Sequence, residues 1–172
     1  ATRALAEDAV ERIEAGWEPL PALSSPERAL AADAPLLHAE LGSNLAFEHS
    51  VEKGEYPHKA REISRSLVFS RHTGVPLEPR TLVADFDPTE RRLTVHQATQ
   101  VPHQMRAVLA ECFDLAEQDV RVLTPDVGGG FGVKLHVYDD EMAACAAAVL
   151  TGRTVKYVCD RLEACSSDIH AR

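Results

Sequence analysis

Apolar residues recur with helical spacing at the start of the chain. Residues 3–15 predict an amphipathic helix ended by Gly16, since one face collects Ala6, Ala9, Val10 and Ile13. The next stretch, WEPLPAL, predicts an extended piece, and Ser24 and Glu27 can form the capping box of a second helix. These elements are too few to enclose a core of their own.

The middle of the chain changes to the period of two that is typical of strands. Three stretches alternate in this way, around Ile63–Phe69, Leu82–Phe86 and Leu93–Val95. Residues 87–90 predict a hairpin turn between the last two. Between residues 36 and 60 the pattern weakens, and the loop residues Gly42, Ser43, Asn44, Gly54 and Pro57 predict a linker there.

Helices and strands alternate in the last third. Pro102 would be the first residue of a helix whose apolar stripe is Met105, Val108, Leu109 and Cys112. Residues 120–123 predict a short buried strand. Asp139 would cap a further helix with the stripe Met142, Cys145 and Val149, ended by Gly152, and residues 154–158 predict a strand. The order favours an α+β, or mixed α/β, domain that lacks its end at Arg172.

The composition narrows the class of protein. The 172 residues carry a formal charge of -9 without a basic stripe, which disfavours nucleic acid and anionic membranes as partners. No apolar run is long enough for a bilayer, so a cytoplasmic or carrier-exported protein is expected. The four cysteines lack paired CxxC spacing; Cys112 and Cys145 are expected in the core, Cys159 and Cys165 near the surface.

The stretch DVGGGFGVK, residues 126–134, raises the question of what its glycines serve. Two phosphate-binding patterns fit poorly, because Val133 stands at the third glycine of GxGxxG and no Ser or Thr follows Lys134. A nucleotide-binding module therefore remains only a weak alternative. Interior glycine costs roughly 0.5–1 kcal/mol relative to alanine. A loop that presents its amides to a ligand is thus favoured over a bare turn, which stays open.

Four motifs together resemble a known family. The segments HTGVPLEPR, QATQVPH, VLTPDVGGGFGVK and GRTVKYVCDR occur in the order and spacing of the large subunit of the xanthine dehydrogenase and aldehyde oxidase family of molybdenum hydroxylases. The early segment ALAEDAVERIEAGWEPLPALSSPERAL is similar to the close of the a/b hammerhead domain of that family. The resemblance implies that residues 1–45 are the end of a hammerhead domain and residues 46–172 an incomplete molybdopterin-binding domain.

The resemblance also implies a function. Family members use molybdenum held by a pterin to oxidise an aldehyde or an N-heterocycle with oxygen from water, and pass electrons to [2Fe-2S] clusters and FAD. The expected partners are therefore the remainder of the molybdopterin-binding subunit, an iron–sulfur subunit and an FAD subunit. This chain alone is expected to be an inactive internal fragment; the alternative is a non-catalytic remnant that folds without cofactor.

The resemblance assigns few site residues to this chain. Gly130, Phe131 and Gly132 match the segment whose amides face the cofactor, and Gln100 matches the glutamine that reaches the molybdenum oxo ligand without binding the metal directly. The family's catalytic base, a glutamate, would lie beyond Arg172. Leu135 stands where purine-oxidising members have an acidic residue, which makes xanthine an unexpected substrate.

Structural roles are expected for several other polar residues. Glu78 and Arg80 suggest a buried pair that locks their strand, and Lys134 either pairs with a carboxylate or lies in solvent. Phe131 is a core anchor by its residue type, with a channel wall as the alternative. The chain's histidines His72, His103 and His136 are expected at the surface, and the pair Asp160 and Arg161 in a charged turn that fixes the next segment.

Overall fold

The chain forms two compact units in the computed structural model, which describes residues 2–54, 61, 63–70 and 72–169. One unit extends to Ile63 and the other begins at Ser64. The predicted boundary after residue 45 stays a prediction, and Pro57 of the predicted linker lies outside the described residues.

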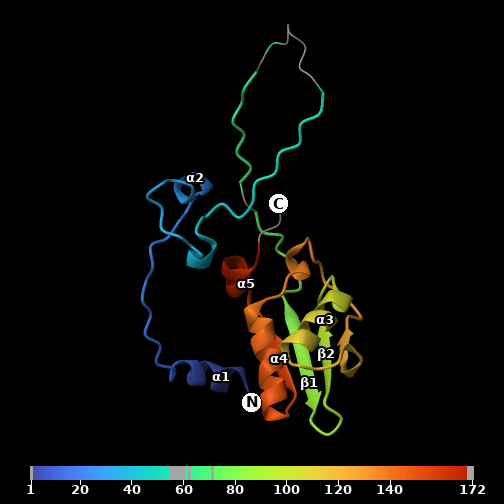
Figure 1. Ribbon diagram of the computed structural model, residues 1–172. Helices are drawn as coiled ribbons and strands as arrows, with labels where there is room; N and C mark the ends of the chain where they lie inside the picture. Colours follow the sequence, from blue (N-terminus) through green and yellow to red (C-terminus); the bar gives the residue numbers. More distant parts are fainter. Residues whose placement is uncertain (1, 55–60, 62, 71, 170–172) are drawn as a thin grey trace. The chain divides into compact units, whose positions relative to one another are not determined.

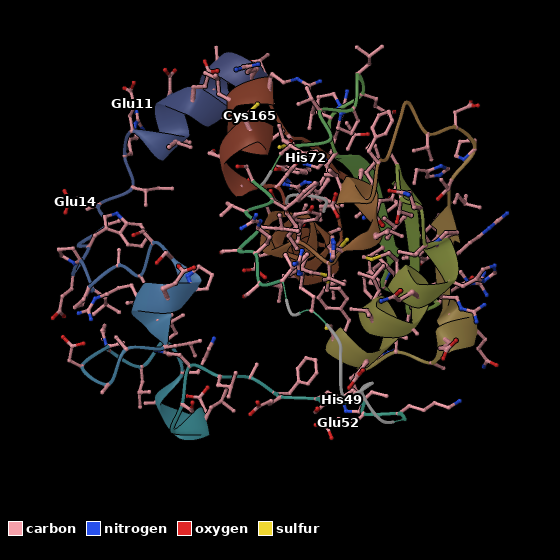
Figure 2. The ribbon with its side chains drawn as sticks, turned by 90° about the horizontal axis from the view of Figure 1, so that it is seen from above. Glu11, Glu14, His49, Glu52, His72 and Cys165 are labelled. Atoms are coloured by element: carbon pink, nitrogen blue, oxygen red, sulfur yellow. The ribbon has the colours of Figure 1, made fainter. Side chains whose placement is uncertain are left out.

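The described residues of the first unit form only short helices, as expected for a stretch without a core. They are α1 (Arg3–Val10), α2 (Pro26–Ala29) and the 3-10 helix η1 (Ala39–Leu41), and none of them has a buried residue. Glu11 and Glu14 follow α1 at the surface (Figure 2).

Two sequence predictions for this unit are wrong in detail. The first helix ends at Val10 instead of reaching Gly16, and the side chain of Ile13 is 70% exposed. A short amphipathic helix without a packing surface is only marginally stable, which accounts for the early end. Ser25 rather than Ser24 caps α2, because its Oγ accepts a 3.2 Å hydrogen bond from the backbone N–H of Arg28 with Pro26 at the first helical position.

The second unit is built on a four-stranded mixed sheet in the order β3-β2-β1-β4 (Figure 1). The strands are β1 (Thr81–Asp87), β2 (Arg92–Gln97), β3 (Val120–Leu123) and β4 (Val155–Val158). β1 runs antiparallel to β2 and β4, and β2 runs parallel to β3. The mixed α/β class and these four predicted strands are confirmed.

The hairpin between β1 and β2 is also confirmed. Asp87 begins the turn, and its Oδ1 accepts hydrogen bonds from the backbone N–H groups of Thr89 and Glu90 at 2.8 and 3.2 Å. An aspartate that binds the backbone two residues on is a common way to stabilise a turn.

The strand predicted around Ile63–Phe69 is wrong. Residues 63–70 form no strand, and Leu67 and Val68 are 91% and 90% exposed. Alternating residues form a stable strand only where another strand supplies hydrogen bonds and a neighbouring surface covers the apolar side chains.

Two helices cover one face of the sheet (Figure 1). α3 (Pro102–Cys112) packs on β3, and α4 (Asp139–Thr151) packs on β1 and β4. Between them and the strands lies one apolar cluster, formed by Leu82, Ala84, Leu93, Val95, Leu109, Ala110, Val120, Ala144, Cys145 and Ala148. The remaining elements are η2 (Glu117–Asp119), η3 (Val133–Leu135) and α5 (Arg161–Ser167).

The helix starts and ends are largely as predicted. Pro102 is the first residue of α3, and Gly152 ends α4 in the left-handed conformation with φ 60°. The prediction that Asp139 caps α4 is wrong by one residue, because Tyr138 holds that position. The expected charged turn at Asp160 begins α5, where Asp160 and Glu163 form a capping box.

Two of the four cysteine predictions are wrong. As expected, Cys145 is buried on α4, and Cys165 is exposed on α5 (Figure 2). Cys112, however, is exposed because it lies on the last turn of α3, whose buried side is Met105, Leu109 and Ala110. Cys159 is buried beside Arg80, at 3.7 Å from Nη2 to Sγ.

The buried guanidinium of Arg80 joins the start of β1 to α4 and to the segment that follows α5. The side chain is 1% exposed, and two of its nitrogens bind the carboxylate of Asp140 on α4, each at 2.7 Å. Its Nε binds Asp168, just after α5, also at 2.7 Å. The guanidinium carbon lies 3.7 Å from the centre of the Tyr138 ring, a cation–π contact. A single cation therefore fixes β1, α4 and the segment after α5.

Two of the carboxylates beside this cation, Asp140 and Glu141, have pKa values shifted in opposite directions. Burial raises the pKa of Glu141 to about 7, and this outweighs the nearby charge of Arg80. Burial also acts to raise the pKa of Asp140, but hydrogen bonds from Arg80 and from Tyr157 hold it below its ordinary value. Glu141 therefore carries a proton over much of the acidic range while Asp140 stays ionised.

Removing the guanidinium should destabilise the protein strongly. Arg80→Met leaves buried carboxylates without a counter-charge, and we expect a loss of about 3–5 kcal/mol in the free energy of unfolding. Urea denaturation measures it. Arg92→Met is the matched control, because Arg92 pairs with Glu90 at the surface, where such a pair contributes about 0–1 kcal/mol. Equal losses in the two variants would contradict a central role for Arg80.

The protonation of Glu141 predicts a pH dependence of stability. Between its ordinary pKa of 4.5 and the folded value of about 7, the native carboxyl holds a proton that the unfolded chain has released. Stability should therefore fall as pH rises through this interval, by at most on the order of 3 kcal/mol. Glu141→Gln should flatten the slope in urea titrations from pH 4.5 to 7.5, whereas the surface control Glu111→Gln should keep it. A wild-type slope in Glu141→Gln would refute this assignment.

Candidate functional site

The glycine loop follows β3 and leads through η3 toward α4. Three of its residues have positive φ, namely Gly129 at 96°, Phe131 at 50° and Gly132 at 83°. Such values are readily adopted by glycine and are uncommon for other residues. The loop therefore changes direction several times within a few residues, which is more than a simple strand-to-helix turn requires.

Gln100 and Gly130, two of the predicted site residues, are brought together. A Cβ on Gly130 would overlap the carboxamide of Gln100, and its distance to Cγ would be 2.8 Å. The backbone N–H of Gln100 donates to the carbonyl of Lys134 at 3.0 Å, which ties the end of the β2 segment to the end of the loop. Gly130 is thus a glycine because another segment's side chain occupies its Cβ position.

Glu78 meets the loop in a similar way at Gly128. Its Oε2 accepts a 2.8 Å hydrogen bond from the backbone N–H of Gly128 and a 2.7 Å bond from Lys134 Nζ. The predicted pair of Glu78 with Arg80 is wrong, since Arg80 binds the carboxylates near α4 and α5. Of the two alternatives for Lys134, pairing with a carboxylate is confirmed: its side chain is 1% exposed.

Four consecutive backbone donors of the loop face no acceptor. Among the described residues, the N–H groups of Gly129, Gly130, Phe131 and Gly132 have no hydrogen-bond partner. A run of closely spaced, unpaired N–H groups is suited to an anionic ligand rich in oxygen atoms. The carboxamide of Gln100 lies beside this run and adds a donor of its own.

Phe131 differs from its expected role. Its side chain is 64% exposed, so the prediction of a core anchor is wrong. Its Cβ lies 2.9 Å from the position a Cβ would take on Gly74, so Gly74 leaves the space in which Phe131 turns outward. Leu135 is also accessible, at 40%. Both apolar side chains are available to contact a ligand or another part of a larger protein.

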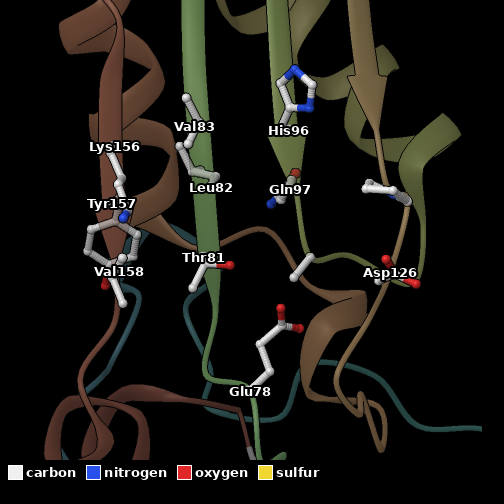
Figure 3. Close-up of a pocket in the computed structure, with 12 residues that line it drawn as sticks. Glu78, Thr81, Leu82, Val83, His96, Gln97, Asp126, Lys156, Tyr157 and Val158 are labelled. Carbon is white, nitrogen blue, oxygen red and sulfur yellow. The ribbon is translucent and has the colours of Figure 1, made fainter.

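A cavity of about 380 Å³ lies next to the loop, where β1 begins and β2 and β3 end (Figure 3). Polar residues from four segments line it, among them Glu78, Thr81, His96, Gln97 and Asp126. The sequence predicts no role for Gln97, although this residue opens the motif QATQVPH at the end of a strand. It is buried, its Nε2 donates to Glu141 Oε2 at 2.7 Å, and its Oε1 has no partner among the described residues.

The three histidines do not converge on a metal. His72 (Figure 2), His103 and His136 are exposed, as expected. In the ranges that the structure describes, no group of three or more His, Cys, Asp or Glu could hold a metal ion. Nor does any helix there combine the length and the apolar character needed to cross a bilayer.

Residues 37–172 match the family described as the molybdopterin cofactor-binding domain. The carbon monoxide dehydrogenase large chain of Hydrogenophaga pseudoflava is 32% identical over 99% of this chain and 23% of its own length. The 6-hydroxypseudooxynicotine dehydrogenase complex subunit gamma of Paenarthrobacter nicotinovorans is 34% identical over 98% of this chain and 21% of its own.

Solved structures agree with these relatives. The reconstituted CO dehydrogenase from Oligotropha carboxidovorans is 33% identical, with a TM-score of 0.84 over 99% of this chain and 23% of that one. The chain therefore spans less than a quarter of the length of each of these three relatives.

Two alanine substitutions in the loop should distinguish a clash with an atom fixed to the backbone from a clash with the end of a flexible side chain. The Cβ of Gly128→Ala meets Glu78 Cβ, which is fixed to the backbone, so we expect a loss of about 1–3 kcal/mol in unfolding free energy. The Cβ of Gly130→Ala meets the end of a flexible, exposed glutamine, which can rotate away at a cost of below about 1 kcal/mol. Urea denaturation gives the ranking, and a shifted side-chain amide NMR signal of Gln100 in Gly130→Ala reports the rotation. The reverse ranking would contradict this arrangement.

Proposed function

Because the chain belongs to the molybdopterin cofactor-binding domain family, we propose that it forms the first part of the cofactor site in a larger molybdenum hydroxylase or dehydrogenase. The observation that carries the proposal is the run of four unpaired backbone N–H groups beside Gln100. Within this larger protein, residues 1–45 are the end of a hammerhead domain and residues 46–172 begin the molybdopterin-binding domain.

The residues present fit a molybdenum–molybdopterin cofactor. Its phosphate and oxygen-bearing groups need donors that are close and unhindered, and the amides of Gly130, Phe131 and Gly132 supply these. Gln100 directs its carboxamide at the same place and would bind an oxygen ligand of the metal, not the metal itself. The bound cofactor supplies the two-electron oxidation of a substrate carbon.

In this proposal, the chain's own residues bind the cofactor and orient the substrate. Glycine at position 130 admits Gln100, and the outward side chains of Phe131 and Leu135 offer apolar surface for a flat substrate. No glutamate in the chain is proposed as the catalytic base, which would lie beyond Arg172, outside the described residues. The chain alone is therefore expected to be inactive.

The proposed substrate class is an aldehyde or an N-heterocycle. The names of relatives cover different substrates, including carbon monoxide and 6-hydroxypseudooxynicotine, so membership in the family does not select one. Leucine at position 135 cannot hydrogen-bond a purine, which disfavours xanthine. Electrons would leave through [2Fe-2S] clusters and FAD on partner subunits or domains, and the assembly would be cytoplasmic.

The decisive experiment uses the full-length protein with its co-expressed partners. Molybdenum analysis and pterin fluorescence should show about one cofactor per large subunit, and the assembly should reduce a dye with an aldehyde or N-heterocycle as electron donor. The isolated 172-residue chain should not. A natively assembled sample without molybdenum or pterin would instead support a remnant that folds without cofactor.

In the same assembly, Gln100→Ala should lower kcat by about 10²–10³-fold while molybdenum content stays near wild type, because one polarised donor at the reacting centre is lost. Gln118→Ala is the matched control, since Gln118 is exposed in η2. Wild-type turnover in Gln100→Ala would remove Gln100 from the site.

A further inference from the structure

One carboxylate, that of Glu78, holds both ends of the glycine loop. Its Oε2 binds the N–H of Gly128 before the unpaired donor run and the ammonium of Lys134 after it, at 2.8 and 2.7 Å. The main chain adds a third bond, from Glu78 N–H to the carbonyl of Gly128 at 3.1 Å. The loop is therefore closed through a residue more than forty positions away in the sequence.

Lys134 extends this connection to Gln100. Its carbonyl accepts hydrogen bonds from the backbone N–H of Gln100 at 3.0 Å and from Thr99 Oγ1 at 3.2 Å. The residue that pairs with Glu78 thus also holds the backbone of Gln100. Moving Lys134 would move Gln100 relative to Gly130.

The two side chains of the ion pair differ in exposure, and the buried ammonium of Lys134 needs the carboxylate of Glu78 as its counter-charge. The lysine side chain is 1% exposed and the glutamate side chain 37%. Among the described residues, Glu78 is the only partner of Lys134 Nζ. A buried ammonium without a counter-charge is costly, so Lys134 stays in place only while Glu78 is ionised. The hydrogen bond from Lys134 holds the pKa of Glu78 below its ordinary value, and the pair is intact at neutral pH.

The glycines fit this arrangement. A Cβ on Gly128 would overlap Glu78 Cβ and lie 3.3 Å from its Oε2, and a Cβ on Gly130 would overlap Gln100. Gly128 leaves space for the side chain of Glu78, which fixes the loop, and Gly130, two residues later, leaves space for the side chain of Gln100. Glu78 and Gln100 therefore both lie against the same backbone segment.

We propose that Glu78 is a positioning residue of the cofactor site: through Gly128 and Lys134 it fixes the unpaired N–H groups of residues 129–132 relative to the carboxamide of Gln100. This inference rests on the function proposed above. Glu78 touches neither substrate nor cofactor in this role, and acts only through the loop and Lys134.

The test compares two variants of the full-length assembly. Glu78→Gln leaves Lys134 buried without a counter-charge, and the double variant Glu78→Gln/Lys134→Met removes the charge as well. Removing both partners of a buried pair commonly restores stability. We expect the double variant to regain most of the unfolding midpoint lost in Glu78→Gln. A positioning role predicts that loop geometry is not regained with it.

Three measurements report the geometry. Amide hydrogen exchange at Val133, whose N–H donates to Gly130 at 2.9 Å, should be at least about tenfold faster than wild type in both variants. The EPR spectrum of partly reduced molybdenum should be shifted in both. The value of kcat should fall by about 10–100-fold with KM within about threefold. Glu117→Gln, which breaks the surface pair with Arg106, is the control and should match wild type in all three.

The outcomes separate this inference from the proposed function. Wild-type exchange and a wild-type EPR spectrum in both variants would overturn the positioning role. So would a double variant in which exchange, spectrum and kcat recover together with stability, because the pair would then act through stability alone. If the wild-type assembly contains no molybdenum, the proposed function fails, while hydrogen exchange at Val133 still tests whether Glu78 orders the loop.

Discussion

The buried guanidinium of Arg80 is the constraint on which the arrangement of the second unit depends. It occupies the residue before β1 and binds carboxylates from the first turn of α4 and from the segment after α5. Its carbonyl also accepts the N–H of Cys159, which follows β4. A guanidinium with five donors in a fixed plane can satisfy several carboxylates in one defined geometry, which a lysine could not do. The ion pairs with Arg80 thus fix the position of α4 and of the segment after α5, in addition to the apolar packing of α4 on the sheet.

The polar residues around Arg80 and those around the glycine loop have different roles. Around Arg80, charges are buried to hold elements together, and one excess carboxylate, Glu141, is accommodated by taking up a proton. Around the loop, a single ion pair of Glu78 and Lys134 leaves the neighbouring backbone donors unpaired. Residues 129–132 are exposed or half-exposed, so their free N–H groups can bond either to water or to a ligand that lies against the loop.

The glycine content of the loop has a physical cause that motif comparison did not supply. Gly128 is needed because the Cβ of Glu78, which is fixed to the backbone, occupies the space of its Cβ; Gly130 leaves room for the movable carboxamide of Gln100, and Gly129 and Gly132 have positive φ. The glycines of the loop therefore accommodate the neighbouring side chains of Glu78 and Gln100, in addition to any ligand. The lysine of the loop, Lys134, is paired with Glu78.

Local physics is enough to place several parts of this protein from its sequence. Period-two alternation locates β1 and β2, Pro102 and Gly152 mark helix ends, and the order of four motifs identifies the family and the loop. The features that depend on distant partners follow from the three-dimensional fold alone. The alternating residues 63–70 form no strand because no neighbouring strand among the described residues pairs with them, and the side chain of Phe131 is exposed. The ion pairs are a further example: Arg80 pairs with Asp140 and Asp168, and Glu78 pairs with Lys134. Those pairings depend on which segments meet in space, and spacing along a chain does not contain that information.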